Sequence, residues 1–403
     1  MNPIYRLFCR TYQLAFRLAL PVLPYREPHV LNELRELGPY LQQQHVSRIL
    51  FITDRPLRAL PMTQSLIDTL SAHGMEVTVF DEVVPNPTVD NVERCRALYE
   101  SGGAQAMVAF GGGSVMDCAK AAGACIARPG LPVQRMGGLL KIRRKTPLLA
   151  AIPTTAGTGS ETTLAAVICD PAENRKYPIN DFVLIPDCAV LDYRVTLGLP
   201  PQITATTGMD ALTHAVEAYI GRSTTALTRA MAEEAVQLIV AHLYRAYTDG
   251  SDSSARAAML RASYCAGVAF TRSYVGYVHG VAHSLGGRYG VAHGLANAVI
   301  LPYFLEEYGS ACHKPLAKLA RLSGLAESGD SDKAAAQRFI DWVWDMNRRM
   351  DIPTRIAQLR REDIPALAAH AAKESNPLYP VPKLMDRREL ERMYTKLLVE
   401  EEL

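Results

Sequence analysis

The residues best suited to chemistry in this chain are histidines and an aspartate that recur at helical spacing. His279 and His283 lie four residues apart, so on a helix they share one face. Asp210 and His214 repeat that spacing upstream, and His293 follows the first pair after a glycine-containing turn. Imidazole and carboxylate groups are typical ligands of zinc and iron(II). The matched spacing favours one enclosed divalent metal site over a set of unrelated core or surface histidines.

Two glycine-rich loops are the next candidates for chemistry. Residues 111–117 (GGGSVMD) follow an apolar run and open a helix, where bare backbone and a helix N-terminus favour a phosphate. The dinucleotide fingerprint GxGxxG is not met, because Met116 stands at its third glycine position. Taken alone, the segment is equally well explained as a tight strand–helix turn. Residues 153–162 (PTTAGTGSET) form a second such loop, rich in hydroxyls. Both loops together favour a pyrophosphate or nicotinamide site at the carboxyl ends of parallel strands.

Asp54 ends the first clear strand of the chain. A carboxylate in that place can hydrogen-bond the ribose 2′-hydroxyl of NAD and repel the 2′-phosphate of NADP. The alternative interpretation is a helix cap or a turn residue. Arg55 beside it could accommodate a 2′-phosphate instead.

The elements that must position these residues change in kind along the chain. The first half alternates β-rich runs with helical patterns such as 63–72 and 89–101, and the runs are 49–53, 76–80, 106–110, 148–152 and 189–191. Alternation of this kind predicts an α/β unit with a mostly parallel sheet covered on both faces. From Pro200 onward the patterns are helical, as in 206–219, 226–247, 254–270 and 333–350. We therefore expect an N-terminal α/β dinucleotide-binding domain over 26–197 and an all-helical, metal-binding C-terminal domain over 198–403.

Composition narrows the functional classes. The chain has 403 residues, of which 48% are hydrophobic and 21% are charged, an ordinary globular balance. The formal net charge of +2 gives no electrostatic footprint for nucleic acid. Eight scattered cysteines without a CxxC pair fit reduced thiols, so we expect a cytoplasmic protein.

Residues 1–25 form a separate segment with an amphipathic, basic helix pattern. Arg6, Arg10, Gln13 and Arg17 make one polar stripe in an otherwise apolar run. The arginines interrupt the apolar core that a signal peptide needs, and the run is too short and too charged to span a bilayer. Two interpretations remain: a helix packed on its own protein or on a second subunit, which we favour, or a helix in weak contact with a membrane surface. Packing on a second subunit predicts a homo-oligomer, a dimer or larger.

Four motifs together resemble the iron-containing (group III) alcohol dehydrogenases, a family that includes lactaldehyde reductases and propanediol and butanol dehydrogenases. They are GGGSVMD, PTTAGTGSET, GMDALTHAVEAY and GYVHGVAHSLGG with AHGLANAVILP, and the resemblance runs from about Val46 to the C-terminus. It implies a metal and a dinucleotide in a cleft between two domains. The implied metal ligands are Asp210, His214, His279 and His293, and His283 is the implied proton-relaying histidine near the nicotinamide.

The resemblance also implies the cofactor contacts. Gly112, Gly113 and Ser114 would contact the pyrophosphate, with Asp117 behind them. The residues that would line the rest of NAD are Thr154, Thr155, Thr158, Lys176 and Asp54. The chain departs from the family in two places. Many members read Asn-Ala-Gly-Leu-Gly where this chain has residues 272–276 (RSYVG), which include Arg272 and Tyr274, and typical members lack the N-terminal helix.

A metal beside a nicotinamide predicts hydride transfer between NAD(H) and a small alcohol or aldehyde, with iron(II) or zinc(II) polarising the substrate oxygen. Two alternatives remain on the same architecture. One is a lyase resembling dehydroquinate synthase, which a glutamate among the ligands would favour. The other is a hydroxyacid–oxoacid transhydrogenase that retains its NAD.

Overall fold

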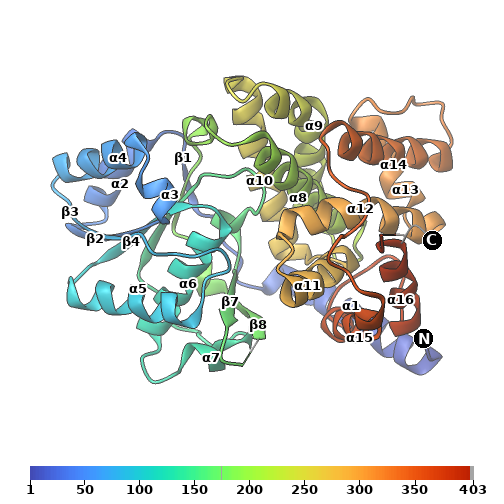
Figure 1. Ribbon diagram of the computed structural model, residues 1–403, viewed down its shortest axis with the longest axis horizontal. Coiled ribbons are helices and arrows are strands. Elements are labelled where there is room, and N and C mark those ends of the chain that lie inside the picture. The colour runs from blue at the N-terminus through green and yellow to red at the C-terminus, as the bar shows by residue number, and fades with distance from the viewer. Residues whose placement is uncertain (174, 400–403) are drawn as a thin grey trace. The chain divides into compact units, whose positions relative to one another are not determined.

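The computed structural model describes residues 1–173 and 175–399, which divide into two compact units. One unit comprises Pro24–Gly198, and the other joins Met1–Leu23 to Leu199–Leu403. Figure 1 shows strands in the first unit and helices in the second. The predicted fold class, an α/β unit with a parallel sheet plus an all-helical unit, is confirmed.

A six-stranded sheet organises the α/β unit, in the order β1-β9-β6-β4-β2-β3. All its pairings are parallel. Its strands are β1 (His29–Leu31), β2 (Arg48–Ile52), β3 (Glu76–Phe80), β4 (Ala106–Gly111), β6 (Leu148–Pro153) and β9 (Cys188–Val190). Five of the six were predicted from apolar runs, and the three-residue β1 was not.

Helices cover both faces of this sheet, as expected for a parallel sheet. They are α2 (Leu37–Gln43), α3 (Arg55–Arg58), α4 (Pro61–Ala72), α5 (Val89–Ser101), α6 (Gly113–Ala127) and α7 (Val133–Met136). Alternate residues of a strand face opposite sides, so Ile49 and Phe51 enter one core while Leu50 and Ile52 enter the other. Figure 1 shows α2 and α4 on one face of the sheet and α5 and α6 on the other.

A second, smaller sheet was not predicted. It has the order β5-β8-β7, with β5 (Gly138–Leu139), β7 (Ala165–Asp170) and β8 (Arg175–Asn180). The β7–β8 pair is antiparallel. β8 carries two charged residues and Pro178, a composition that hides a strand from a search for apolar runs.

The second unit is built from helices. They are α1 (Pro3–Ala19), α8 (Pro201–Ile220), α9 (Ala226–Thr248), α10 (Ser253–Ser273), α11 (Tyr277–Tyr289), α12 (His293–Tyr308), α13 (His313–Leu322), α14 (Asp332–Arg349), α15 (Ile364–Ser375) and α16 (Arg387–Lys396). α8 is almost entirely buried from Thr204 onward, so its polar side chains lie inside the unit. Within the part of the chain that the structure describes, no helix combines the length and apolar character needed to cross a bilayer.

Candidate metal centre and cofactor loops

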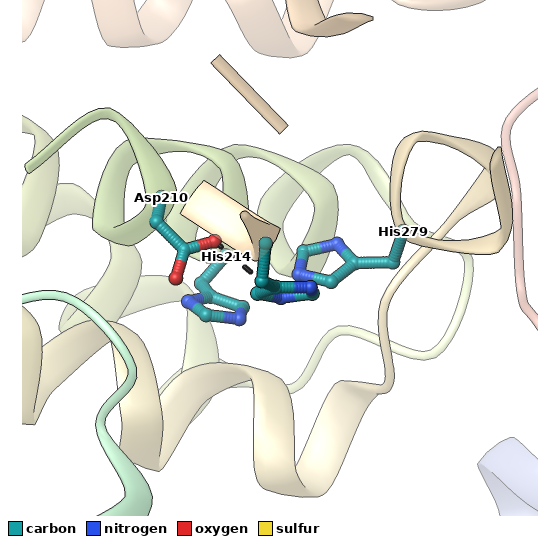
Figure 2. A group of neighbouring side chains, drawn as sticks. Asp210, His214 and His279 are labelled. Carbon is teal, nitrogen blue, oxygen red and sulfur yellow. Dashed lines mark ion pairs between the residues drawn. The ribbon is translucent and has the colours of Figure 1, made fainter. Parts of the chain in front are cut away.

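The four predicted metal ligands come together in the helical unit. Asp210 and His214 lie one turn apart on α8, His279 lies in the first turn of α11, and His293 begins α12. One ligand atom from each lies within 4.8 Å of every other, and three of the residues are buried. The side chain of His293 is 34% exposed, so the cluster opens on its side. Figure 2 shows Asp210, His214 and His279 directed toward one another.

The donor set fits one divalent metal. One carboxylate and three imidazoles are ligands that both zinc and iron(II) accept. Burial raises the pKa of Asp210 to about 7 and lowers that of His279 well below its usual value. Burial thus disfavours the charged form of both side chains, and a cation among them would favour the ionised form of the carboxylate.

Glu217 orients His279. It lies seven residues after Asp210, which is two turns along the same face of α8. Its carboxylate shares a 2.6 Å hydrogen bond with His279 Nδ1 and accepts the backbone N–H groups of Gly276 and Val278. A proton held on Nδ1 leaves Nε2 unprotonated, so its lone pair is free to bind a metal. Any side chain at position 276 would lie 2.5 Å from Glu217 Oε1, so glycine is required there.

Asn297 completes the cluster from α12, one turn after His293. Its Nδ2 donates to Asp210 Oδ1 over 2.7 Å and lies 3.1 Å from the Nε2 atoms of His279 and His293. Its Oδ1 is buried and has no hydrogen-bond partner among the described residues. A buried polar atom in that state is typical of a site completed by a ligand. Neither Glu217 nor Asn297 was predicted from the sequence, although Glu217 lies seven residues after Asp210 and Asn297 lies four residues after His293.

The close approach of α12 to α8 depends on Gly294. A Cβ at this position would lie 2.7 Å from the carbonyl oxygen of Thr206. Glycine therefore lets α12 begin against α8, which brings His293 to Asp210, with 3.6 Å between Nε2 and Oδ1.

His283 lies beside the cluster. Its ring centroid is 5.9 Å from that of His279 and 5.3 Å from that of His293. Its Nδ1 shares a 2.6 Å hydrogen bond with Glu374 of α15, which also accepts the hydroxyl of Tyr379 over 2.7 Å. The side chain is 30% exposed. A partly exposed imidazole that is oriented by a carboxylate is suited to proton transfer. Glu374 was not predicted, because its helix is 91 residues from His283 in sequence.

The two glycine-rich loops meet in the α/β unit. They follow β4 and β6, which are neighbours paired at Gly111 and Pro153. Gly112 caps α6 and Gly113 begins it. Cβ atoms there would lie 3.4 Å from Thr155 Oγ1 and 3.0 Å from Thr158 Cγ2. The loops therefore form one surface of bare backbone and hydroxyls at a helix N-terminus, a setting that favours a phosphate.

Two more of the predicted cofactor residues, Thr154 and Asp117, hold the loops together. Thr154 is buried and donates its N–H to the carbonyl of Gly111. Asp117 accepts from the Ser160 hydroxyl and from the N–H of Val167, so its carboxylate ties α6 to the second loop and to β7. These contacts agree with the expectation that Asp117 lies behind Gly112 and Gly113.

Lys120 ties the same elements together and was not predicted. Its ammonium is buried, and five oxygens of Ser160, Thr163 and Ala165 lie 2.6–3.0 Å away and share its three N–H groups. Burial lowers the pKa of Lys120, and the carboxylates of Asp117 and Glu161 oppose that shift. A buried ammonium must satisfy its three N–H groups, so these contacts fix the loop after β6 against α6.

Ser114 and Lys176 share one neighbour. Asn86 donates its N–H to Ser114 Oγ over 3.2 Å, and its Oδ1 accepts from Lys176 Nζ over 2.7 Å. Lys176 lies on β8, within the sheet that was not predicted. The β7–β8 hairpin thus brings a cation to the loop before α5, and Asn86 of that loop contacts the first turn of α6.

Asp54 caps α3. Its side chain accepts the N–H of Leu57 over 2.8 Å, so the helix-cap interpretation describes one of its roles. It also lies two residues beyond the end of β2, the strand between β3 and β4. A carboxylate can accept more than one hydrogen bond, so capping leaves a role toward a ribose as a prediction.

Comparison with known proteins supports the family resemblance. Residues 30–193 match the family profile "Iron-containing alcohol dehydrogenase", and residues 204–398 match "Fe-containing alcohol dehydrogenase family, C-terminal". The NAD-dependent methanol dehydrogenase of Bacillus methanolicus is 35% identical over 350 residues, covering 85% of this chain and 92% of that protein. Lactaldehyde reductase of Escherichia coli K12 is 34% identical, covering 82% of this chain and 87% of that protein.

Solved structures are similar over nearly the whole chain. A 1,3-propanediol oxidoreductase superposes with a TM-score of 0.89 at 33% identity, covering 93% of this chain and 99% of that one. Sulfoacetaldehyde reductase from Bifidobacterium kashiwanohense, solved with NAD+, gives a TM-score of 0.83 at 28% identity, with 93% and 98% covered. Both halves, the order of their motifs and the ligand cluster lead to one conclusion: the chain belongs to the iron-containing alcohol dehydrogenase family.

Proposed function

We propose that the protein is a metal-dependent, NAD(H)-linked alcohol dehydrogenase that also runs in reverse as an aldehyde reductase. The observation that carries the proposal is the cluster of Asp210, His214, His279 and His293, whose ligand atoms lie within 4.8 Å of one another. Its substrates are small alcohols and aldehydes, the class in the names of its relatives.

The helical unit orients the substrate and moves its proton. A divalent metal, when bound, supplies Lewis acidity toward a substrate oxygen. Glu217 holds His279 in one tautomer, and Asn297 holds the Asp210 carboxylate. His283, fixed at Nδ1 by Glu374, keeps Nε2 for proton exchange with the substrate hydroxyl, directly or through water.

The α/β unit holds the cofactor. Gly112, Gly113 and Ser114 bind the pyrophosphate at the start of α6, and Thr154, Thr155 and Thr158 line the nicotinamide side. Lys176 and Asp117 support this surface through Asn86 and Ser160. Asp54 gives a preference for NAD over NADP because its charge repels a 2′-phosphate.

Two other activities are not favoured. A lyase of the dehydroquinate synthase type would be supported by a glutamate in the ligand set, but here Glu217 bonds a ligand histidine from behind. A transhydrogenase would retain its NAD, whereas the relatives are named as dehydrogenases and reductases. Turnover of two organic substrates without added NAD would identify a transhydrogenase.

We further propose that the protein works in the cytoplasm as a homo-oligomer. Support for the location is the scattered, unpaired set of cysteines. Light scattering of the intact chain gives the number of subunits.

The decisive experiment is NADH oxidation against short aldehydes, diols, ketoacids and long-chain aldehydes. The protein is first stripped of metal and then loaded with iron(II) or zinc(II) in separate samples. We expect aldehyde-dependent NADH oxidation with at least one metal and none in the stripped protein. Equal turnover in the stripped protein would refute the proposal.

A further inference from the structure

The outward face of α1 is apolar, although α1 lies on the surface of its unit. Among the described residues, fifteen large hydrophobic side chains are exposed. Eight of them lie within residues 1–22. They are Ile4, Tyr5, Leu7, Phe8, Tyr12, Leu14, Leu18 and Val22. Leu18 is 71% exposed and Ile4 is 78% exposed. A surface helix normally turns its apolar stripe inward, so the orientation of α1 is reversed.

Polar contacts fix this orientation. Arg10 donates to the carbonyl oxygens of Val381 and Pro382, and Gln13 donates to those of Pro377 and Tyr379. Further anchors are buried Cys9 and Leu20 and the terminal amine of Met1, which pairs with Asp386. Arg10 and Gln13, two polar side chains that a sequence pattern would place in water, thus attach the helix, and its apolar face is left outside.

The two edges of the exposed face differ in character. Arg6 and Arg17 are exposed and eleven residues apart, three helical turns, so they lie along one edge. Tyr5 and Tyr12, two turns apart, lie along the other. A groove of about 570 Å³ beside Tyr5 is lined by exposed Lys373, by Arg387, which pairs with Glu391, and by Asp386, which pairs with the Met1 amine. Residues 1–26 contain four arginines and no acidic residue.

We propose that the outward face of α1 docks on an anionic lipid surface. Apolar side chains would enter the interface, the tyrosines suit its polar boundary, and the arginines face lipid phosphates. The charge pattern disfavours a second copy of the chain as the occupant. Antiparallel pairing of two α1 helices about a two-fold axis would bring their arginine edges together, with no acid in residues 1–26 to pair them. The apolar face is also wider than the narrow seam of a helix pair, since Phe8, Tyr12 and Leu14 are exposed with Leu7 and Leu18.

The experiment uses the full-length, metal-loaded protein and sedimentation with vesicles. One set of vesicles mixes phosphatidylglycerol with phosphatidylcholine, and the other contains phosphatidylcholine alone. We expect binding to the anionic set that weakens as salt is added. Replacing Arg6→Gln and Arg17→Gln together should weaken it about 10- to 30-fold, at about 1 kcal/mol per cation.

The apolar face is tested by Leu7→Glu, Leu14→Glu and Leu18→Glu in one variant. A matched control carries Leu227→Glu and Leu322→Glu, two leucines that are about 40% exposed on α9 and α13. All five leucines are exposed, so both variants should keep metal content and activity. The α1 variant should lose vesicle binding, and the control should retain it.

Three results would overturn the proposal. The wild type could fail to bind either vesicle set, or the α1 variant could bind as well as the control. In the third, the wild type would not bind vesicles, and light scattering would show a smaller assembly for the α1 variant than for the wild type. That result would assign the face to a second copy of the chain. None of these results depends on the proposed catalytic activity.

Discussion

Phe16 of α1 packs edge-on against Tyr274 at the end of α10, with 4.9 Å between ring centroids and 76° between ring planes. Tyr274 has φ 63° and ψ 176°, a backbone conformation that glycine adopts and other residues rarely do. The family resemblance implies glycine at this position. The two expected departures from the family, the bulky residue before α11 and the N-terminal helix, are therefore in contact.

The backbone conformation of Tyr274 predicts an unusual order of stabilities among its variants. Tyr274→Ala should destabilise the protein more than Tyr274→Gly, because both lose the ring and only glycine removes the backbone strain of about 1–3 kcal/mol. Denaturant unfolding gives the comparison. Combining Phe16→Ala with each change should show coupling of about 0.5–1.5 kcal/mol between the rings. Equal stability of the alanine and glycine variants would contradict the strain.

The second prediction separates two glutamates that each hold a histidine. Glu217→Gln should lower metal affinity about 10- to 100-fold, because a carboxylate behind a ligand histidine fixes its tautomer. Competition with a fluorescent chelator measures the affinity. Glu374→Gln is the matched control: it makes the same chemical change behind His283, and it should lower turnover while affinity for the metal stays unchanged. Equal losses of metal in both variants would refute the assignment.

The histidines of α11 give the third prediction. His279→Ala should abolish activity and strongly reduce bound metal. His283→Ala should keep nearly stoichiometric metal and lower turnover by about 10²–10⁴-fold, the usual contribution of a proton-transferring group. Metal analysis and steady-state rates on the same samples distinguish the roles. Full metal occupancy with normal turnover in His279→Ala would refute the ligand set.

Cofactor choice gives the fourth prediction. The wild type should prefer NADH over NADPH, and Asp54→Asn should reduce that preference by about tenfold, or about 1.4 kcal/mol. Asparagine is the sharper test than glycine because its oxygen can still cap α3 at Leu57. The ratio of kcat/KM for the two cofactors is the measurement. A wild type that already favours NADPH would place the selecting role on Arg55.

Local spacing explains which parts of the site were predictable from the sequence. Asp210 with His214, and His279 with His283, show their relation within one helical turn, and the apolar runs of β2, β3, β4 and β6 are equally local. Residues such as Glu374 carry no local mark, because their function comes from a partner on a distant helix.

Other features depend on packing and are invisible to periodicity. The pair β7–β8 holds polar residues and a proline, so its strand character comes from pairing rather than from an apolar pattern. For α1, the sequence showed an arginine stripe and an apolar face. It could not show that Arg10 and Gln13 would turn inward, because the carbonyl groups they bind lie more than 360 residues away.

The last prediction concerns metal removal, with stability as the readout. Because the metal binds the folded cluster, saturating it should raise the free energy of unfolding by about 2.7 kcal/mol at 100 times the dissociation constant. A chelator should therefore lower the melting temperature of the wild type in calorimetry. His279→Ala should show no further shift, since its cluster has already lost a ligand. Leu322→Glu, at a surface position on α13, should shift as much as the wild type. A wild-type melting temperature that is unchanged by complete metal removal would contradict binding of the metal to the folded cluster.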